Sequence, residues 1–187
     1  MQGELVTWAA SRAGGAACVV ALLCAGGARA SDKLALGPAA PWVQPLVLPT
    51  KSAPPTDAAV RILVHDRQFN FSRAFDEAYF ENLIRIQTPQ GLATVGTISL
   101  PWKPDTDVLT VHKLHIIRNG QIIDVLASGQ TFTVLRRENN LEYSALDGVL
   151  TATIQPSGLQ VDDMVDLAYS VRRTEPVLGG TSEWVLG

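Results

Sequence analysis

Cysteine is almost absent from this chain of 187 residues, because its two copies, Cys18 and Cys24, both lie within the first thirty residues. If those residues are removed during export, no thiol remains. A cysteine nucleophile, a cysteine-bound zinc ion and a disulfide framework are then all excluded. A domain without these supports must be held together by its apolar core.

Charge of either sign is also scarce, since charged residues make up 18% of the chain and the formal net charge is -3. The basic pairs Arg136-Arg137 and Arg172-Arg173 each have a glutamate nearby. A nucleic-acid-binding protein instead concentrates Lys and Arg on one face, where they displace counterions from phosphates. We therefore expect neither a nucleic-acid partner nor a basic patch for a membrane surface.

Residues 1–30 have the layout of a secretory signal peptide. Arg12 precedes an apolar run over residues 16–25, and residues 28–30, Ala-Arg-Ala, supply the small side chains that signal peptidase requires. We predict cleavage before Ser31 and a periplasmic or secreted product with no stable transmembrane anchor. An uncleaved anchor is the alternative, although the apolar run is shorter than the roughly 20 residues that cross a bilayer.

Residues 31–59 contain six prolines and are predicted to form an extended leader. Each proline fixes φ and removes a backbone donor, so this stretch cannot join the interior of a helix or a sheet. Trp42, Val43 and Leu46 could still pack the leader along the outside of the domain. That packing role is favoured over recognition by a proline-binding module.

From Val60 onward, short β-branched and aromatic runs alternate with turn residues, a pattern typical of an all-β domain. The clearest signal is a hairpin in which residues 114–118 and 121–125 flank Asn119-Gly120. This dipeptide readily adopts the positive φ angles of a type I′ turn, whose twist matches that of the flanking strands. We therefore predict two antiparallel strands joined at residues 119–120.

Further strands are predicted from alternating apolar and polar residues. In the last of them, Val165 and Leu167 lie on a buried face while Asp166 lies on a wet one, the pattern of an antiparallel sandwich sheet. Helical spacing behind Ser72 is an alternative for residues 72–87, but the neighbouring pattern favours a strand there. The predicted strands cover residues 60–65, 79–87, 92–100, 150–155 and 165–172. The predicted fold class is an all-β, antiparallel β-sandwich-like domain after a signal peptide and a proline-rich leader.

Candidate metal ligands are few. His112 and His115 are three residues apart, and on a regular strand such positions point to opposite faces, so the two imidazoles converge only if a bulge intervenes. A structural role is therefore favoured for both. Residues 162, 163 and 166 are aspartates, but they lack the alternating oxygen ligands and closing glutamate of a known calcium loop. We interpret them as acidic turn residues before a strand.

Catalytic patterns are similarly weak. Ser128-Gly129 and Ser157-Gly158 read as ordinary turns, because neither lies in a strand-to-helix elbow. Gly91 is read as part of a hairpin, since a phosphate loop would need a helix after it. Paired carboxylates remain an open alternative, with these candidates: Glu77, Glu81, Glu138 and Glu142. We therefore assign no catalytic, cofactor-binding or metal-binding residue and expect no cofactor.

Several short segments in a fixed order carry a family resemblance. They are residues 85–92, 117–124, 146–150, 159–163, 168–171 and 173–176. This order, behind a signal peptide, resembles the domain of unknown function that precedes the transglutaminase-like core in exported bacterial proteins. The resemblance covers roughly residues 60–178 and implies a β-sandwich-like, non-catalytic module. The catalytic cysteine, histidine and aspartate would then belong to the following domain.

The resemblance leads to a functional expectation. Residues 60–178 would form a secreted accessory or binding module that accompanies a transglutaminase- or protease-like domain, and residues 179–187 a tail or the start of a truncated linker. Its partner would be that domain in the full-length product, which would make this chain a fragment, or a separate envelope protein. The alternative is a free-standing envelope domain that binds glycan or peptide through exposed Trp102 and Trp184. A carboxylate-based hydrolase is the last choice, so we expect no enzyme.

Overall fold

The computed structural model describes residues 34–46, 56–136 and 148–174. These residues form nine strands and one short helix. The elements are β1 (Ala35–Leu36), β2 (Val60–Phe71), β3 (Asp76–Ile86), α1 (Pro89–Val95), β4 (Ile98–Trp102), β5 (Asp107–Arg118), β6 (Gln121–Asp124), β7 (Thr133–Arg136), β8 (Leu150–Ile154) and β9 (Met164–Arg173).

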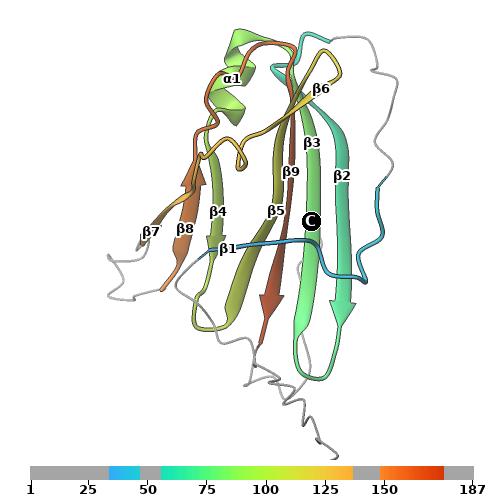
Figure 1. Ribbon diagram of the computed structural model, residues 1–187, viewed down its shortest axis with the longest axis vertical. Helices are drawn as coiled ribbons and strands as arrows, with labels where there is room; N and C mark the ends of the chain where they lie inside the picture. Colours follow the sequence, from blue (N-terminus) through green and yellow to red (C-terminus); the bar gives the residue numbers. More distant parts are fainter. Residues whose placement is uncertain (1–33, 47–55, 137–147, 175–187) are drawn as a thin grey trace, which may run out of the picture.

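The strands form two sheets (Figure 1), and side chains from both sheets join in shared core clusters. The large sheet has the order β1-β5-β9-β3-β2, and β6 pairs with the free part of β5. The small sheet has the order β4-β8-β7. Pairing is antiparallel everywhere among these strands except between β1 and β5. The predicted all-β, sandwich-like fold class is confirmed.

The core lies between the inner face of the large sheet and the small sheet. One cluster gathers Leu114 and Ile116 of β5 with Ile154 of β8. A second cluster gathers Leu109 of β5 with Trp102 of β4. Because successive side chains of a strand point to opposite faces, these residues line one side of each sheet, and their burial provides the main apolar stabilisation.

The predicted hairpin is confirmed. Strands β5 and β6 pair from Arg118↔Gln121 to His115↔Asp124, and the two turn residues have φ angles of 51° at Asn119 and 78° at Gly120. Two consecutive positive φ angles define the type I′ turn that the dipeptide favours.

The segment after β3 differs from the prediction. Gly91 was expected in a hairpin before a strand over residues 92–100, but it lies inside helix α1, and β4 begins only at Ile98. The Thr88 side chain accepts a hydrogen bond from the Gly91 amide, and Pro89 occupies the first turn, which is a favourable start for a helix. The Thr-Pro capping signal overrides the weak β pattern that follows it.

The first long strand also departs from simple alternation. A register shift between Ile62 and Val64 indicates a bulge in β2, with Ile62 opposite Ile84 and Val64 opposite Leu83. The extra residue moves Val64 to the face opposite Ile62. Ile62, in this edge strand, is 61% exposed.

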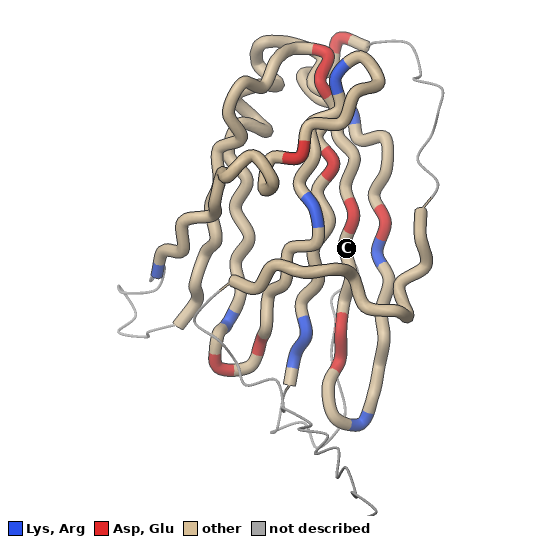
Figure 2. Tube along the Cα trace, viewed as in Figure 1, with Lys and Arg blue, Asp and Glu red and all other residues tan. Residues whose placement is uncertain are grey.

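The polar face of β9 is buried over residues 166–170, contrary to the prediction of a wet face on the last strand. Residues 34–46 run from β5 across the sheet towards β2, and Figure 1 shows this leader lying over the strands. Asp166, Ala168 and Ser170 of β9 are each less than 5% exposed. Figure 2 shows acidic and basic residues midway along the central strands. The alternating pattern of the sequence would place such residues in water.

Several predictions lie outside the described residues. They are the signal peptide over residues 1–30, the tail over residues 179–187, and the candidates Glu138, Glu142 and Trp184. Among the described residues, no helix combines the length and apolar character that crossing a bilayer requires.

Candidate functional site

A row of buried polar side chains crosses the middle of the outer face of the large sheet. Strand pairing brings its members together, since Tyr79 of β3 lies opposite Ser170 of β9, and His115 of β5 lies opposite Asp166 of β9. Glu81 is two residues from Tyr79 and therefore shares its face. Buried polar groups on three adjacent strands make this row the strongest candidate for a site.

Lys113 is the centre of the row. Its ammonium nitrogen lies 2.5 Å from Glu81 Oε1 and 2.8 Å from Asp166 Oδ2. The hydroxyl of Tyr79 donates to the other oxygen of Glu81 at 2.7 Å. The second oxygen of Asp166 is buried and has no hydrogen-bond partner among the described residues. One ammonium group thus contacts two buried carboxyl groups.

The pKa values reflect this arrangement. Burial alone would lower the pKa of Lys113, but its hydrogen bonds to Asp166 and Glu81 outweigh that effect and hold the pKa above its ordinary value. Burial raises the pKa of the Asp166 carboxyl, and Lys113 offsets part of the increase. Burial and the hydrogen bond to Glu81 also raise the pKa of the Tyr79 phenol.

These shifts limit the chemistry of the cluster. At neutral pH Lys113 carries a proton and cannot act as an amine nucleophile, because that role needs a lowered pKa. The phenol of Tyr79 also keeps its proton and donates it in a hydrogen bond. The cluster therefore holds charges in fixed positions, and a fixed donor and acceptor pattern suits binding or positioning.

His112 lies at one end of the row, and the expectation that it faces away from His115 is wrong. A register shift between Val111 and Lys113 marks a bulge at His112, which puts both imidazoles on the outer face. The two nitrogens of His112 lie 2.9 Å from the Gly37 carbonyl oxygen and 2.8 Å from Ser170 Oγ. Its ring also stacks on Tyr79, with 5.7 Å between the ring centroids.

The two histidines nonetheless have separate partners. His115 Nε2 lies 3.8 Å from Asp124 Oδ2 across the β5–β6 hairpin, whereas His112 contacts the leader and β9. Within residues 34–46, 56–136 and 148–174, no group of three or more His, Cys, Asp or Glu side chains is arranged to hold a metal ion.

The three aspartates that suggested calcium lie beside three different cations. Asp162 pairs with Arg85 at 2.8 Å, and Asp166 pairs with Lys113. Asp163, which is 1% exposed, accepts two hydrogen bonds from the guanidinium of Arg118, at 2.8 and 2.7 Å. The Arg118 hydrogen bonds lower the pKa of Asp163. These contacts tie loop and strand ends together rather than assemble one cation site.

The serine and carboxylate candidates are placed as follows. Gly129 and Gly158, each next to a candidate serine, have φ angles of 91° and 76°, which are turn conformations. Glu77 and Glu81 are both buried on the outer face of β3. Glu77 accepts from Trp42 Nε1 at 2.9 Å and pairs with Arg172 at 3.4 Å, so its carboxylate is already engaged.

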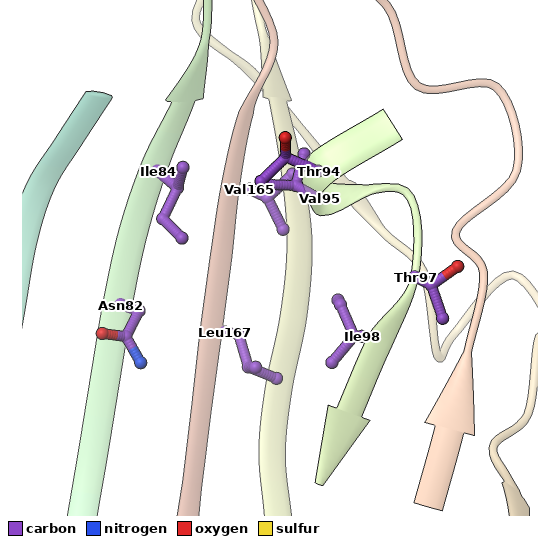
Figure 3. Close-up of a pocket in the computed structure, with 8 residues that line it drawn as sticks. All are labelled: Asn82, Ile84, Thr94, Val95, Thr97, Ile98, Val165 and Leu167. Carbon is purple, nitrogen blue, oxygen red and sulfur yellow. The ribbon is translucent and has the colours of Figure 1, made fainter. Parts of the chain in front are cut away.

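A hollow of about 190 Å³ opens between the inner face of the large sheet and the α1–β4 segment (Figure 3). Figure 3 shows Ile84, Leu167 and Ile98 around it, with Asn82 and two threonines at its border. The lining residues carry no ionisable side chain. Pockets for drug-sized ligands begin at roughly 300 Å³, so this hollow suits a single apolar side chain better than a cofactor.

Trp102, expected as an exposed binding aromatic, is buried. Its side chain is 3% exposed and packs with Leu100 and Leu150 in the core of the small sheet. The pattern Ser-Leu-Pro-Trp places residues 100 and 102 on one face of β4. Trp102 therefore stabilises the fold and cannot form a surface platform.

Residues 76–185, more than half of the chain, match the family model described as a Domain of Unknown Function with solved-structure structure, DUF3857. The chain belongs to the DUF3857 family. The predicted resemblance to a domain of unknown function is thereby confirmed, while the association with a transglutaminase-like core stays a prediction. The family match begins at β3, so β1, β2 and the leader lie outside it.

The DUF3857 chain is also similar in fold to part of a crystal structure of a putative protease from Parabacteroides distasonis. The TM-score is 0.55 and the sequence identity is 14%. The similarity covers 62% of this chain and 23% of that chain, so this chain corresponds to less than a quarter of the protease's length. At this identity the likeness shows a shared fold alone. No curated protein sequence matches the chain.

Sequence reasoning did not find the Lys113 cluster. The detectable signal was a lysine inside a long strand, between His112 and Leu114, together with Asp166 between Val165 and Leu167 in another strand. Their pairing depends on register across β5 and β9, which one sequence does not reveal.

Proposed function

We propose that this chain is a non-catalytic module of an exported protein that accompanies a transglutaminase- or protease-like domain and positions polypeptide for it. The observation that carries the proposal is the fold likeness to less than a quarter of a longer protease chain. A domain-sized unit that recurs inside a longer chain is typical of an accessory module.

The ionic contacts of the domain support a structural rather than catalytic use of its acids. Five buried carboxylates each lie beside a cation: Glu77 with Arg172, Glu81 and Asp166 with Lys113, Asp107 with Arg173, and Asp163 with Arg118. A general acid or base must be free to exchange a proton with substrate. Carboxylates held in these pairs are better suited to fixing strands in place.

The alternative of a free-standing envelope domain that binds through Trp102 loses one of its two anchors, because that side chain is in the core. Its other anchor, Trp184, lies outside the described residues. The accessory role therefore remains the better supported of the two.

The non-catalytic part is tested with the purified chain from Ser31 to Gly187. We expect no turnover of peptide, ester or glycoside substrates. Turnover that a single Glu77→Gln or Glu81→Gln change abolishes, without loss of folding by circular dichroism, would contradict the proposal.

The accessory part is tested on the catalytic domain itself. The coding sequence beyond codon 187 and the adjacent genes are read for a domain with the transglutaminase-like Cys, His and Asp. We expect that domain to cleave or transfer peptide substrates with a lower KM when this module is joined to it than when it acts alone. An unchanged KM and kcat would remove the positioning role.

Export is tested separately by sequencing the N-terminus of the protein recovered from the periplasm or medium. We expect it to begin at Ser31. A mature chain that retains Cys24 would overturn both the cleavage prediction and the thiol-free interpretation.

A further inference from the structure

The leader segment over residues 37–46 crosses the outer face of the large sheet and makes one turn on the way, closed by the hydrogen bond from the Val43 amide to the Ala40 carbonyl oxygen at 3.0 Å. It starts beside β5, where the Gly37 amide donates to the Val111 carbonyl oxygen at 3.2 Å. It then passes over β9 and β3 and reaches β2 at Gln68 (Figure 1). The segment lies across the strands rather than along them, so between these points it adds no sheet ladder.

Most of the polar contacts that hold this segment are to its main chain. The side-chain amide of Gln68 accepts from the Gln44 amide at 2.8 Å and donates to the Gln44 carbonyl oxygen at 2.9 Å. This paired contact imitates a neighbouring β-strand. His112 lies 2.9 Å from the Gly37 carbonyl oxygen. Main-chain contacts accept many sequences, as in other proteins that bind extended peptides.

In these contacts, one side chain of the segment forms a hydrogen bond with a buried polar group of the sheet. Trp42 Nε1 donates to Glu77 Oε2 at 2.9 Å, and Glu77 is 6% exposed. An indole with a satisfied N–H is a frequent anchor at binding surfaces, since it combines a large apolar area with one directed hydrogen bond.

The segment does not fill the space beneath it. A cleft of about 350 Å³ remains between the segment and the sheet, with Tyr79, Glu81, His112 and Lys113 on its floor. The segment contributes small or apolar side chains to the opposite wall, among them Ala39 and Val43. A fold that needed this cover only for packing would be expected to close the gap, because protein interiors are dense.

We propose that the outer face of the large sheet is a binding groove for a peptide segment, and that residues 37–46 are an intramolecular ligand that another chain's segment can replace. The ligand class is an uncharged, proline-containing peptide with one tryptophan that can form the turn seen at residues 40–43. Proline fixes φ in such a peptide before it binds, which lowers the entropy cost of ordering it. The inference stands whether or not a protease-like domain accompanies the module.

The tether explains how the groove is kept occupied. A ligand in the same chain competes at an effective concentration of the order of 1 mM, so a free peptide displaces it poorly. Weakening the leader without altering the groove should therefore reveal binding that the wild-type chain conceals.

The test uses the whole mature chain, residues 31–187, and a fluorescein-labelled peptide with the sequence of residues 34–46. The leader variant carries Trp42→Ala and Gln44→Pro, which remove the indole anchor and the amide that donates to Gln68. We expect fluorescence anisotropy to show the labelled peptide binding this variant at least tenfold more tightly than the wild type. Residue 44 precedes another proline and is extended already, so the change suits the local backbone.

Two matched controls assign the binding to the groove. Adding Gln68→Ala to the leader variant removes the paired main-chain contact, and we expect roughly tenfold weaker peptide binding. A labelled peptide with proline at the position of Gln44 should bind the leader variant more weakly, by a similar factor. Equal binding in all four combinations would indicate non-specific adsorption and would overturn the proposal.

Absence of peptide binding to a folded leader variant, at concentrations up to about 1 mM, would also overturn it. If the variant does not fold, hydrogen exchange of the wild type decides. We then expect the amides of Gly37 and Gln44 to exchange through local opening, at least tenfold faster than those of β9. If both amides exchange at the same rate as those of β9, the leader is a fixed part of the fold and the proposal is overturned.

Discussion

The charge cluster on the outer face provides the sharpest test of the energetics, through the change Lys113→Met. Methionine keeps much of the length and apolar stem of lysine but removes the ammonium. Glu81 and Asp166, which are 4% and 1% exposed, would then be two buried carboxylates without their cation. The variant isolates the effect of that single positive charge.

Breaking a buried ion pair by removing one partner costs about 3–5 kcal/mol. The Lys113 side chain is 26% exposed, so water screens part of the interaction and the lower end applies. We expect the free energy of unfolding to fall by about 3 kcal/mol near neutral pH. For a chain of this size that corresponds to a decrease of roughly 6–12 °C in Tm.

The pH dependence follows from the pKa directions. Burial already raises the folded-state pKa of Asp166 above 3.8, so its ionisation costs stability as the pH rises through that raised value. Removing Lys113 raises the pKa further, and the deficit of the variant should grow from acid to neutral pH. In the wild type, the favourable contribution of Lys113 is present below pH 10.5 and is lost as the pH rises through its raised pKa.

Urea unfolding followed by circular dichroism, at about pH 5 and near neutral pH, measures both effects. The matched control is Lys103→Met, which removes an exposed lysine and should change stability by no more than about 0.5 kcal/mol. A deficit below about 1 kcal/mol for Lys113→Met near neutral pH, or one that is independent of pH, would refute the reasoning.

Three further perturbations probe the backbone and the second buried ion pair. Gly91→Ala would place a Cβ 2.1 Å from the carbonyl oxygen of Ala59, just before β2, so Tm should fall by several degrees. Gly37→Ala would place a Cβ with no described atom within 4 Å, so it should leave Tm unchanged. Gly120→Ala should cost about 1 kcal/mol in chemical unfolding, because φ there is 78°. Asp163→Asn should remove stability that the wild type has above pH 3.8 and loses as the pH falls through the lowered pKa, so acid titration of the two proteins should converge.

The parts of the fold that could be predicted are those set by local chemistry. The hairpin at Asn119-Gly120 follows from two positive φ angles that this dipeptide tolerates, and β9 follows from ten residues of regular alternation. The helix at Pro89 was also encoded locally by the Thr88 cap, but the single glycine at position 91 was read as a turn residue. There the error was one of interpretation rather than of missing information.

The parts that could not be predicted depend on contacts between distant segments. Each bulge adds one residue and reverses the faces beyond it, and no residue type at Leu63 or His112 announces this change. Asp166 is buried beside Lys113, which lies in another strand. Alternation in one strand shows that two faces differ but cannot show what covers the polar one.

The composition of the leader has a physical explanation in this position. A segment that crosses strands at an angle cannot form a ladder with them, so each of its amide groups would need another partner or water. Prolines at positions 38, 41 and 45 lack that donor, and Gly37 and Gln44 direct theirs to defined acceptors. The same prolines that keep this stretch out of a sheet interior therefore suit it to cover the face of one. A cover of this kind, held mainly through its main chain, is also the kind of ligand that a second chain could supply.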